Sequence, residues 1–304
     1  MARTLFLFLT LVAGGLTAVL TASMQNAEAT SLLGRKLSTP PMAPDAQARM
    51  EAQLATAVRA FEINREDPDA RIWVGRRTAY LGRFREAIGL FTEGITRFPN
   101  DARFYRHRGH RYLTIREIDL AIADFEQAVT LITNQPDQVE PDGQPNARKT
   151  PTSTLHSNIY YHLALGYYIK KDFTRAADAW NKARDVVRNA DNLVAASHWL
   201  YLSLRRAGRT EEAAAVLLPI DERLDVIENG SYHSLLLMYK GERTPEAVLK
   251  AAGEGSGATA VRYGVSAWYL INGKRREAQQ LWASILEGPD WPSFGHLAAE
   301  AEAR

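Results

Sequence analysis

The chain has 304 residues, of which 46 % are apolar, 24 % charged and 9 % aromatic, and its formal net charge is +2. This composition is typical of a folded globular protein, and so small a net charge argues against a partner recognised by bulk charge, such as nucleic acid or an anionic membrane. Because there is no cysteine, disulfides, thiolate metal sites, iron–sulfur clusters, cysteine nucleophiles and a lipid-modified cysteine anchor are excluded.

Residues 1–29 have the pattern of a secretory signal peptide. Arg3 supplies a positive start, residues 5–20 form an uncharged apolar run, and residues 27–29 form a small-x-small cleavage sequence ending at Ala29. We therefore expect an exported protein, periplasmic or secreted, whose mature chain begins near Thr30.

The alternative for this segment is an uncleaved N-terminal anchor. Residues 5–24 are almost long enough to span a bilayer, whereas every later apolar stretch is interrupted by charges. Residues 30–44 are predicted to be a disordered linker that leads into the folded part of the chain.

A first helix is predicted over residues 45–64. Its apolar residues lie four, four and three positions apart, at Met50, Leu54, Val58 and Phe61, which is the spacing of one helix face. We expect this helix to cover the first repeat as a cap, because the end of a repeat array otherwise exposes an apolar face. The alternative is a docking surface for a partner.

Two repeats follow, and together with the cap they account for residues 45–133. Three positions recur with a constant offset of 34 residues, Gly75 with Gly109, Ala87 with Ala121 and Phe91 with Phe125. The small residues are predicted where two helices cross closely, and the aromatic ring is predicted between neighbouring units. Pro99 is expected to end the second helix of the first pair.

Residues 134–154 interrupt this pattern. The segment contains four prolines and almost no apolar residue, so we expect a loop inserted after the second unit. Such an insertion is either functional or a tolerated surface loop, and the sequence leaves both interpretations open.

The repeat pattern resumes over residues 155–304. The third unit is clear, the fourth and fifth are degenerate, and the sixth recovers the pattern, as marked by Ala164, Ala176 and Trp180, then Leu204 and Ala213, then Thr244 and Pro245, and finally Ser266, Ala278 and Trp282. A short closing helix is expected over 293–304. The prediction is an all-α solenoid of about six antiparallel helix pairs with a capping helix at each end.

From about Asp45 to Pro289 these residues resemble the tetratricopeptide repeat family. The resemblance implies a right-handed superhelix whose first helices line a concave groove for peptides or protein segments. The latter half also resembles the NlpI-type envelope adaptors of Gram-negative bacteria, in residues 198–202, 239–241 and 268–270. The missing lipid-accepting cysteine is a departure from those adaptors.

The resemblance also suggests a binding site. If Ala102 opens the second unit, the family pattern places eight residues of three successive units on the concave side: Arg76, Tyr80, Arg103, Arg106, His110, Asn158, Tyr161 and Tyr168. Guanidinium and phenol groups suit the carboxylates and the extended backbone of an acidic peptide. The alternative is an ordinary solvated charged face.

The sequence carries no strong sign of an enzyme. His107 and His110 are three residues apart and share a helix face, but no third ligand has a recognisable spacing to them. The nucleophile elbow and the phosphate-binding glycine loop are missing from the sequence. The predicted function is therefore an exported, non-enzymatic protein-interaction scaffold without a cofactor. The alternative is a histidine-dependent metal-binding or hydrolytic enzyme of the envelope.

Overall fold

The computed structural model describes residues 27–304, so all but the last three residues of the predicted signal peptide lie outside the described part. Within it the regular secondary structure is helical except for one small hairpin and one isolated bridge between Val139 and Thr154, and the all-α prediction is confirmed. The helices are α1 (Pro44–Ile63), α2 (Pro68–Tyr80), α3 (Phe84–Arg97), α4 (Ala102–Thr114), α5 (Ile118–Ile132), α6 (Leu155–Ile169), α7 (Phe173–Asp185), α8 (Ala190–Arg206), α9 (Thr210–Val216), α10 (Gly230–Tyr239), α11 (Pro245–Ala251), α12 (Gly255–Ile271), α13 (Arg275–Glu287) and α14 (Phe294–Ala303). The strands are β1 (Ala29–Thr30) and β2 (Lys36–Leu37), paired antiparallel.

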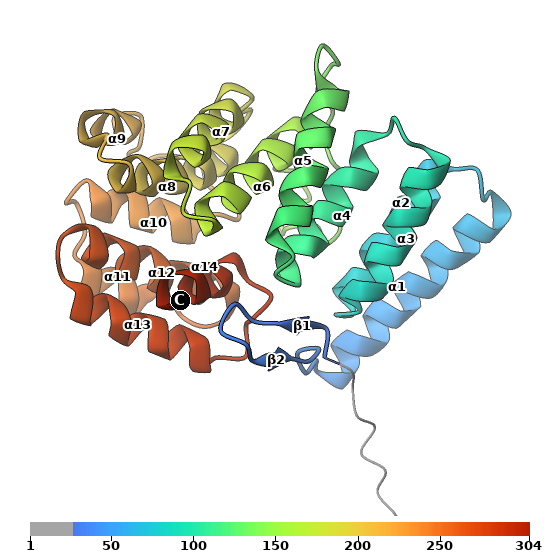
Figure 1. Cartoon of the computed structure of the whole chain (residues 1–304), viewed down its shortest axis with the longest axis horizontal. Helices are drawn as coiled ribbons and strands as arrows, with labels where there is room; N and C mark the ends of the chain where they lie inside the picture. The colour runs from blue at the N-terminus through green and yellow to red at the C-terminus, as the bar shows by residue number, and fades with distance from the viewer. Residues whose placement is uncertain (1–26) are drawn as a thin grey trace, which may run out of the picture.

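Helices α2 to α13 follow one another as antiparallel pairs around an arc, with α1 at one end (Figure 1). In the first two pairs the predicted close crossings are confirmed. A Cβ atom on Gly75 would lie 2.5 Å from the ring of Phe91, and one on Gly109 would lie 2.9 Å from the ring of Phe125. Both rings are almost completely buried, so the tetratricopeptide-type spacing reflects how the two helices of a pair fit together.

Helix α1 packs on α2, as a capping helix should. Its predicted apolar face is only half-buried, and Arg71 of α2 stacks over the ring of Phe61, with the guanidinium carbon 4.6 Å from the ring centroid. The cap therefore shields the first pair without forming a core of its own.

The prediction of a disordered linker over residues 30–44 is wrong for its first part. Residues 29–37 form the hairpin β1–β2, which is held by residues from the far end of the chain. The backbone N–H of Leu32 donates to Glu300 of α14 at 2.9 Å, and the indole of Trp291 donates to the carbonyl of Ser38 at 2.8 Å. These long-range contacts supply the order that the composition of the segment does not predict.

The closing helix is present, but it does not cover an outer end of the array. Figure 1 shows α14 on the inner side of the arc, where it packs against α12, α13 and α6. Arg116, in the turn between α4 and α5, forms a buried ion pair with Glu300 at 2.7 Å. The ring of Trp291 meets Phe84 edge-on at 5.5 Å between centroids. The last residues therefore tie the C-terminal half to the first two helix pairs.

Among residues 27–304, no helix combines the length and the apolar character that crossing a membrane requires.

Two glycines of the first pair give a matched test of this packing. Gly75→Ala should lower the free energy of unfolding by about 1–3 kcal/mol, because the ring of Phe91 must shift to admit the new methyl group. Gly89 lies in α3, and a Cβ atom added there would meet no atom within 4 Å, so Gly89→Ala should raise it by about 0.5–1 kcal/mol through helix propensity. Urea unfolding followed by circular dichroism measures both, and equal effects of the two substitutions would contradict the tight crossing at Gly75.

Candidate functional site

The candidate site lies on the inner face of α2, α4 and α6, which we call the N-terminal groove. These three helices are the first members of consecutive pairs, so their inner faces lie side by side. Asp67 caps α2 and Asp101 caps α4, each accepting a hydrogen bond from a backbone N–H of the first turn, while Thr154 and Ser157 form a capping box on α6. The caps fix where each helix begins.

The inserted segment, residues 134–154, fills this groove. It contains no helix, as predicted, but it does not project into solvent. Its two arms pair with each other, because the N–H of Glu140 donates to the carbonyl of Ser153 at 3.0 Å and the N–H of Leu155 donates to that of Gln138 at 2.9 Å. The arm 137–143 then runs in extended form across the inner faces of α2, α4 and α6.

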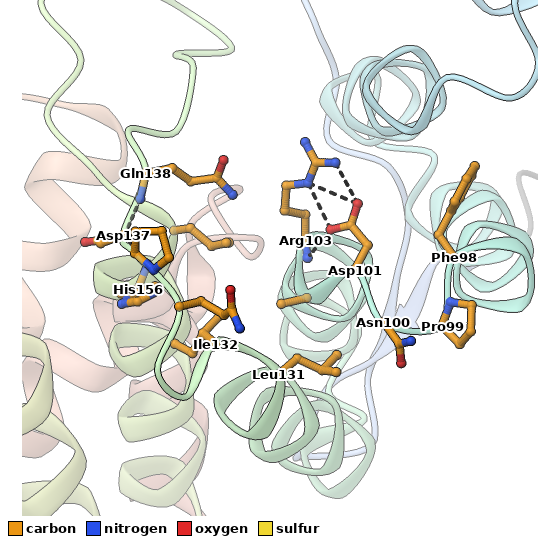
Figure 2. Close-up of a pocket in the computed structure, with 14 residues that line it drawn as sticks. Phe98, Pro99, Asn100, Asp101, Arg103, Leu131, Ile132, Asp137, Gln138 and His156 are labelled. Carbon is orange, nitrogen blue, oxygen red and sulfur yellow. Dashed lines mark hydrogen bonds and ion pairs between the residues drawn. The ribbon is translucent and has the colours of Figure 1, made fainter.

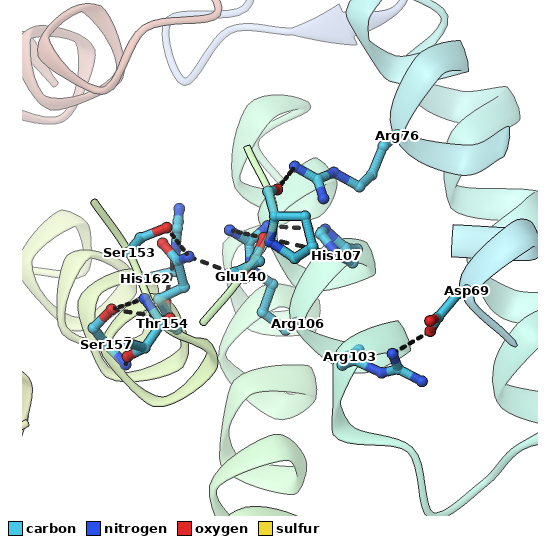
Figure 3. A network of polar contacts seen from close by, with 12 residues as sticks. Asp69, Arg76, Arg103, Arg106, His107, Glu140, Ser153, Thr154, Ser157 and His162 are labelled. Atoms are coloured by element: carbon cyan, nitrogen blue, oxygen red, sulfur yellow. Dashed lines mark hydrogen bonds and ion pairs between the residues drawn. The ribbon is translucent and has the colours of Figure 1, made fainter. Parts of the chain in front are cut away.

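Glu140 provides the central contact of the arm (Figure 3). Its carboxylate pairs with the guanidinium of Arg106 at 3.0 Å and accepts a hydrogen bond from the side-chain amide of Asn158, also at 3.0 Å. The imidazole of His107 lies 3.9 Å from the same carboxylate. The side chains of Arg106 and Glu140 are each about nine-tenths buried. The hydrogen bond between these two ionised groups is therefore charge-assisted, and both groups are largely shielded from water.

Backbone carbonyls of the arm receive two further arginines. Arg76 donates to the carbonyl of Pro141 at 2.9 Å, and Arg77 donates to that of Gly143 at 2.7 Å. Gly143 is buried under Tyr80, and a Cβ atom there would overlap the phenol oxygen. The groove thus recognises one carboxylate, two carbonyls and one residue without a side chain.

Positive charge dominates the interior of the groove. Burial lowers the pKa of Arg106, Glu140 raises it, and the nearby Arg76 lowers it again. Burial lowers the pKa of Arg111 to about 10, and Arg111 forms no ion pair within residues 27–304. Both guanidinium groups stay protonated at neutral pH, so the groove has more cations than carboxylates.

The predicted site residues divide into three sets. Arg76, Tyr80, Arg106 and Asn158 are brought together around the inserted segment. Arg103 lies at the outer edge of the groove and pairs with Asp101 at 2.6 Å and with Asp69.

The other three predicted residues do not line the N-terminal groove, which corrects that part of the prediction. The hydroxyl of Tyr161 accepts a hydrogen bond from the indole of Trp199 at 2.9 Å, and the hydroxyl of Tyr168 accepts one from Tyr263 at 2.8 Å. His110 packs against His162, with ring centroids 4.4 Å apart. The closing of the arc by the C-terminal half buries Tyr168, leaves Tyr161 partly buried, and places His110 on the wall of a separate cavity of about 380 Å³.

Glu140, Gly143 and Arg77 were not predicted from the sequence. The signal that could have found them is charge complementarity, since the inserted segment is acidic where the predicted groove is basic. The residue pattern of the inserted segment does not by itself predict that the segment binds in the groove.

An open cavity of about 900 Å³ borders the outer side of the inserted segment. Figure 2 shows the paired Arg103 and Asp101 on one side of it and Asp137, Gln138 and His156 on the other. A smaller cavity of about 160 Å³ lies between α2 and the arm, and it shares Arg103, Gln138 and Leu155 with the first. The two cavities therefore reach the arm from Asp137 to Pro141, whereas Gly143 is covered by Tyr80.

The histidines were the basis of the enzyme alternative. Burial and the charge of Arg106 hold the pKa of His107 well below its usual value, and burial and Arg111 do the same for His110. Neutral imidazoles could bind a metal, but no group of three or more His, Asp or Glu side chains with suitable geometry occurs in the described residues. The site offers histidine packing and hydrogen bonding instead.

No protein-family model matches the chain. Among solved structures, it is similar to YrrB, a TPR protein with an unusual peptide-binding site, at 16 % identity over 82 % of this chain and 98 % of that chain, with a TM-score of 0.42. It is similar to a tetratricopeptide repeat protein from Parabacteroides merdae at 13 % identity over 79 % and 87 %, with a TM-score of 0.47. It is similar to a double mutant of MamA at 17 % identity over 66 % of this chain and 94 % of that chain, with a TM-score of 0.43. The helix pairing and 34-residue spacing of this chain define its fold independently of these similarities.

Buried neutral histidines make the stability of this chain depend on pH. The pKa of His107, His110 and His162 is well below 6.5, and burial lowers that of His198 to about 3. The unfolded chain then binds protons that the folded chain does not, so stability is full above the unfolded pKa and falls as the pH drops below it. At about pH 5.5, each such histidine should lower the free energy of unfolding by about 1 kcal/mol relative to neutral pH.

The substitution His198→Phe tests this dependence. It should reduce, by about 1 kcal/mol, the loss of unfolding free energy between about pH 7.5 and pH 5.5. Tyr239→Phe is the matched control, because it removes the hydrogen bond between the Tyr239 hydroxyl and His198 without removing a group that titrates in this range. Urea titrations at both pH values measure the difference. The same pH dependence in His198→Phe as in the unmodified protein would count against the explanation.

Proposed function

We propose that this chain is an exported protein-interaction scaffold that binds an extended acidic segment of a partner protein in the N-terminal groove. One observation carries the proposal: the groove already holds an extended acidic segment, residues 137–143, through Arg106, Asn158, Arg76 and Arg77. The contacts are of the kind that a foreign peptide could make, because two of the four are to backbone carbonyls and do not depend on sequence.

The chemistry of these contacts favours an acidic partner over a neutral one. A guanidinium that is about nine-tenths buried is costly to leave without a counter-charge, and a carboxylate is the group that pairs with it best. The carbonyl contacts of Arg76 and Arg77 add a requirement for extended backbone, since a helix uses its own carbonyls internally.

The export component rests on the signal-peptide pattern of residues 1–29. Cleavage after Ala29 would leave the pairing of Thr30 with Lys36 and the contact of Leu32 with Glu300 in place. The resemblance of the latter half to NlpI-type adaptors agrees with an envelope role and stays a prediction. No observation on the described residues favours the histidine-dependent enzyme.

Photo-crosslinking in the cell envelope tests the proposal. A photoreactive residue at Gln138, which borders both cavities, should capture a partner through a segment rich in Asp or Glu, as mapped by mass spectrometry. Measured in the Glu140→Gln protein, where the inserted segment no longer uses the charge of Arg106, Arg106→Gln should reduce this capture by about tenfold or more, the value of a lost charge-assisted hydrogen bond, while helicity by circular dichroism is unchanged.

The control position is Gln127, which is exposed on α5 outside both cavities. A probe there should not capture the same protein. Equal capture from the two positions, or capture that does not respond to Arg106→Gln, would contradict the groove as the binding site.

A further inference from the structure

The inserted segment occupies the position that the proposed partner needs. The carboxylate of Glu140 is the group paired with Arg106, so an external acidic segment and residues 137–143 cannot both use Arg106 and Asn158. The route by which a partner enters the groove, which rests on the proposed function, must therefore involve movement of these residues.

The inserted segment is joined to the molecule mainly by polar contacts. The buried apolar residues of the neighbouring core run from Ile132 directly to Leu155, and none comes from the residues between them. Val139, a large apolar residue of the arm, is 62 % exposed. A segment with so little buried apolar surface opens at lower cost than the helices around it.

The fit of the arm to the groove is also incomplete. The Nε atom of Arg106 and one carboxylate oxygen each of Asp137 and Asp142 are buried without a hydrogen-bond partner among the described residues. Arg111 adds a cation that no carboxylate pairs with in residues 27–304. A ligand with a further acceptor or carboxylate beside Arg106 Nε or Arg111, and without unpaired carboxylate oxygens of its own, would complement the groove better than the chain's own segment does.

Both ends of the inserted segment are fixed, so an opened arm would stay close to its site. At its start, the segment follows the buried Ile132 of α5, whose carbonyl accepts a hydrogen bond from the N–H of Gln135 at 2.9 Å, and at its end the Thr154 capping box begins α6. Beyond the arm, Thr152 donates to Glu228 at 2.7 Å and Asn146 donates to it at 2.9 Å. A tethered ligand of this kind competes at a high effective concentration even when each contact is weak.

We infer that residues 137–143 are an internal ligand, and that an acidic partner segment binds the N-terminal groove by displacing them. The contacts define the partner's chemistry: an acidic residue for Arg106 and Asn158, an extended chain for Arg76 and Arg77, and glycine three residues after the acidic one. The glycine is needed because Tyr80 lies against that position. In the chain itself the matching sequence is Glu140-Pro141-Asp142-Gly143.

A synthetic peptide with the sequence of residues 136–145, capped at both ends, is the probe. It should bind the Glu140→Gln protein about tenfold or more tightly than the unmodified protein, because the internal competitor has lost its charge. Fluorescence anisotropy of the labelled peptide measures the affinities. Glu211→Gln is the matched control for loss of charge, since Glu211 is exposed on α9 far along the chain from the groove, and it should bind like the unmodified protein.

Two altered peptides test the recognition rule. Replacing the glutamate that corresponds to Glu140 by glutamine, or the glycine that corresponds to Gly143 by valine, should each weaken binding to the Glu140→Gln protein by about tenfold or more. Equal binding of the altered and original peptides would overturn the rule.

Hydrogen exchange distinguishes displacement from binding elsewhere. The amides of Glu140 and Leu155, which donate to Ser153 and Gln138, should lose protection when the peptide saturates the unmodified protein. Equal affinity for the unmodified and Glu140→Gln proteins with protection retained would overturn the internal-ligand inference and leave the scaffold proposal standing. No binding to the Glu140→Gln protein, with those amides already exchanging freely, would overturn the proposed function together with the inference.

A further variant tests whether the arm can leave the groove at all. Asn158→Ala removes a second contact to Glu140 without changing the charge of the arm, so it should also increase the exchange of the Glu140 amide. Unchanged exchange in both variants would show the arm to be a permanent part of the fold, which contradicts the inference.

Discussion

Helix α4 carries Arg106 into the interior of the molecule, where 8 % of the residue remains exposed, and a buried cation requires a counter-charge. An ordinary groove open to water would leave that charge solvated. Here the inserted segment crosses the groove, and its Glu140 pairs with the guanidinium at 3.0 Å, so the segment both covers the charge and supplies its counter-charge. The path of the inserted segment and the burial of Glu140 follow from this pairing.

The closing of the arc depends on a second buried ion pair, that of Arg116 with Glu300. Burial by itself would raise the pKa of Glu300, but hydrogen bonds from His296 and Arg116 lower it to about 2, so the carboxylate stays ionised at any ordinary pH. The two buried pairs differ in what supports them. Glu300 lies on a helix that is anchored by the apolar core, whereas Glu140 lies on a segment without apolar anchors. The first pair is therefore part of the framework, and the second can open while the framework stays intact.

The sequence was sufficient for features that repeat locally. The offset of 34 residues, with Gly75 against Phe91 and Gly109 against Phe125, reports how adjacent helices fit, and those contacts are short in sequence. The hairpin and the inward position of α14 depend on pairs such as Leu32 with Glu300, which are 268 residues apart and leave no periodic trace. The inserted segment was correctly predicted to be a loop. Its proline-rich polar composition, however, does not distinguish an extended chain in solvent from an extended chain that is bound through its carbonyls. The family pattern suggests concave positions for Tyr161 and Tyr168, but long-range contacts to Trp199 and Tyr263 leave Tyr161 partly buried and Tyr168 fully buried.

The internal ligand also sets the kind of partner that the groove can select. A segment with one carboxylate merely matches what residues 137–143 already offer, and the tethered arm has the advantage of proximity. A segment with additional carboxylates gains more, because Arg111 and the Nε atom of Arg106 are still unpaired among the described residues. Weakly acidic segments are therefore excluded by competition, whereas helical segments are excluded because their carbonyls are already used internally. Such a groove discriminates by the difference between two ligands, one of which is part of the protein, so its specificity can be changed by substitutions in the inserted segment as well as in the groove.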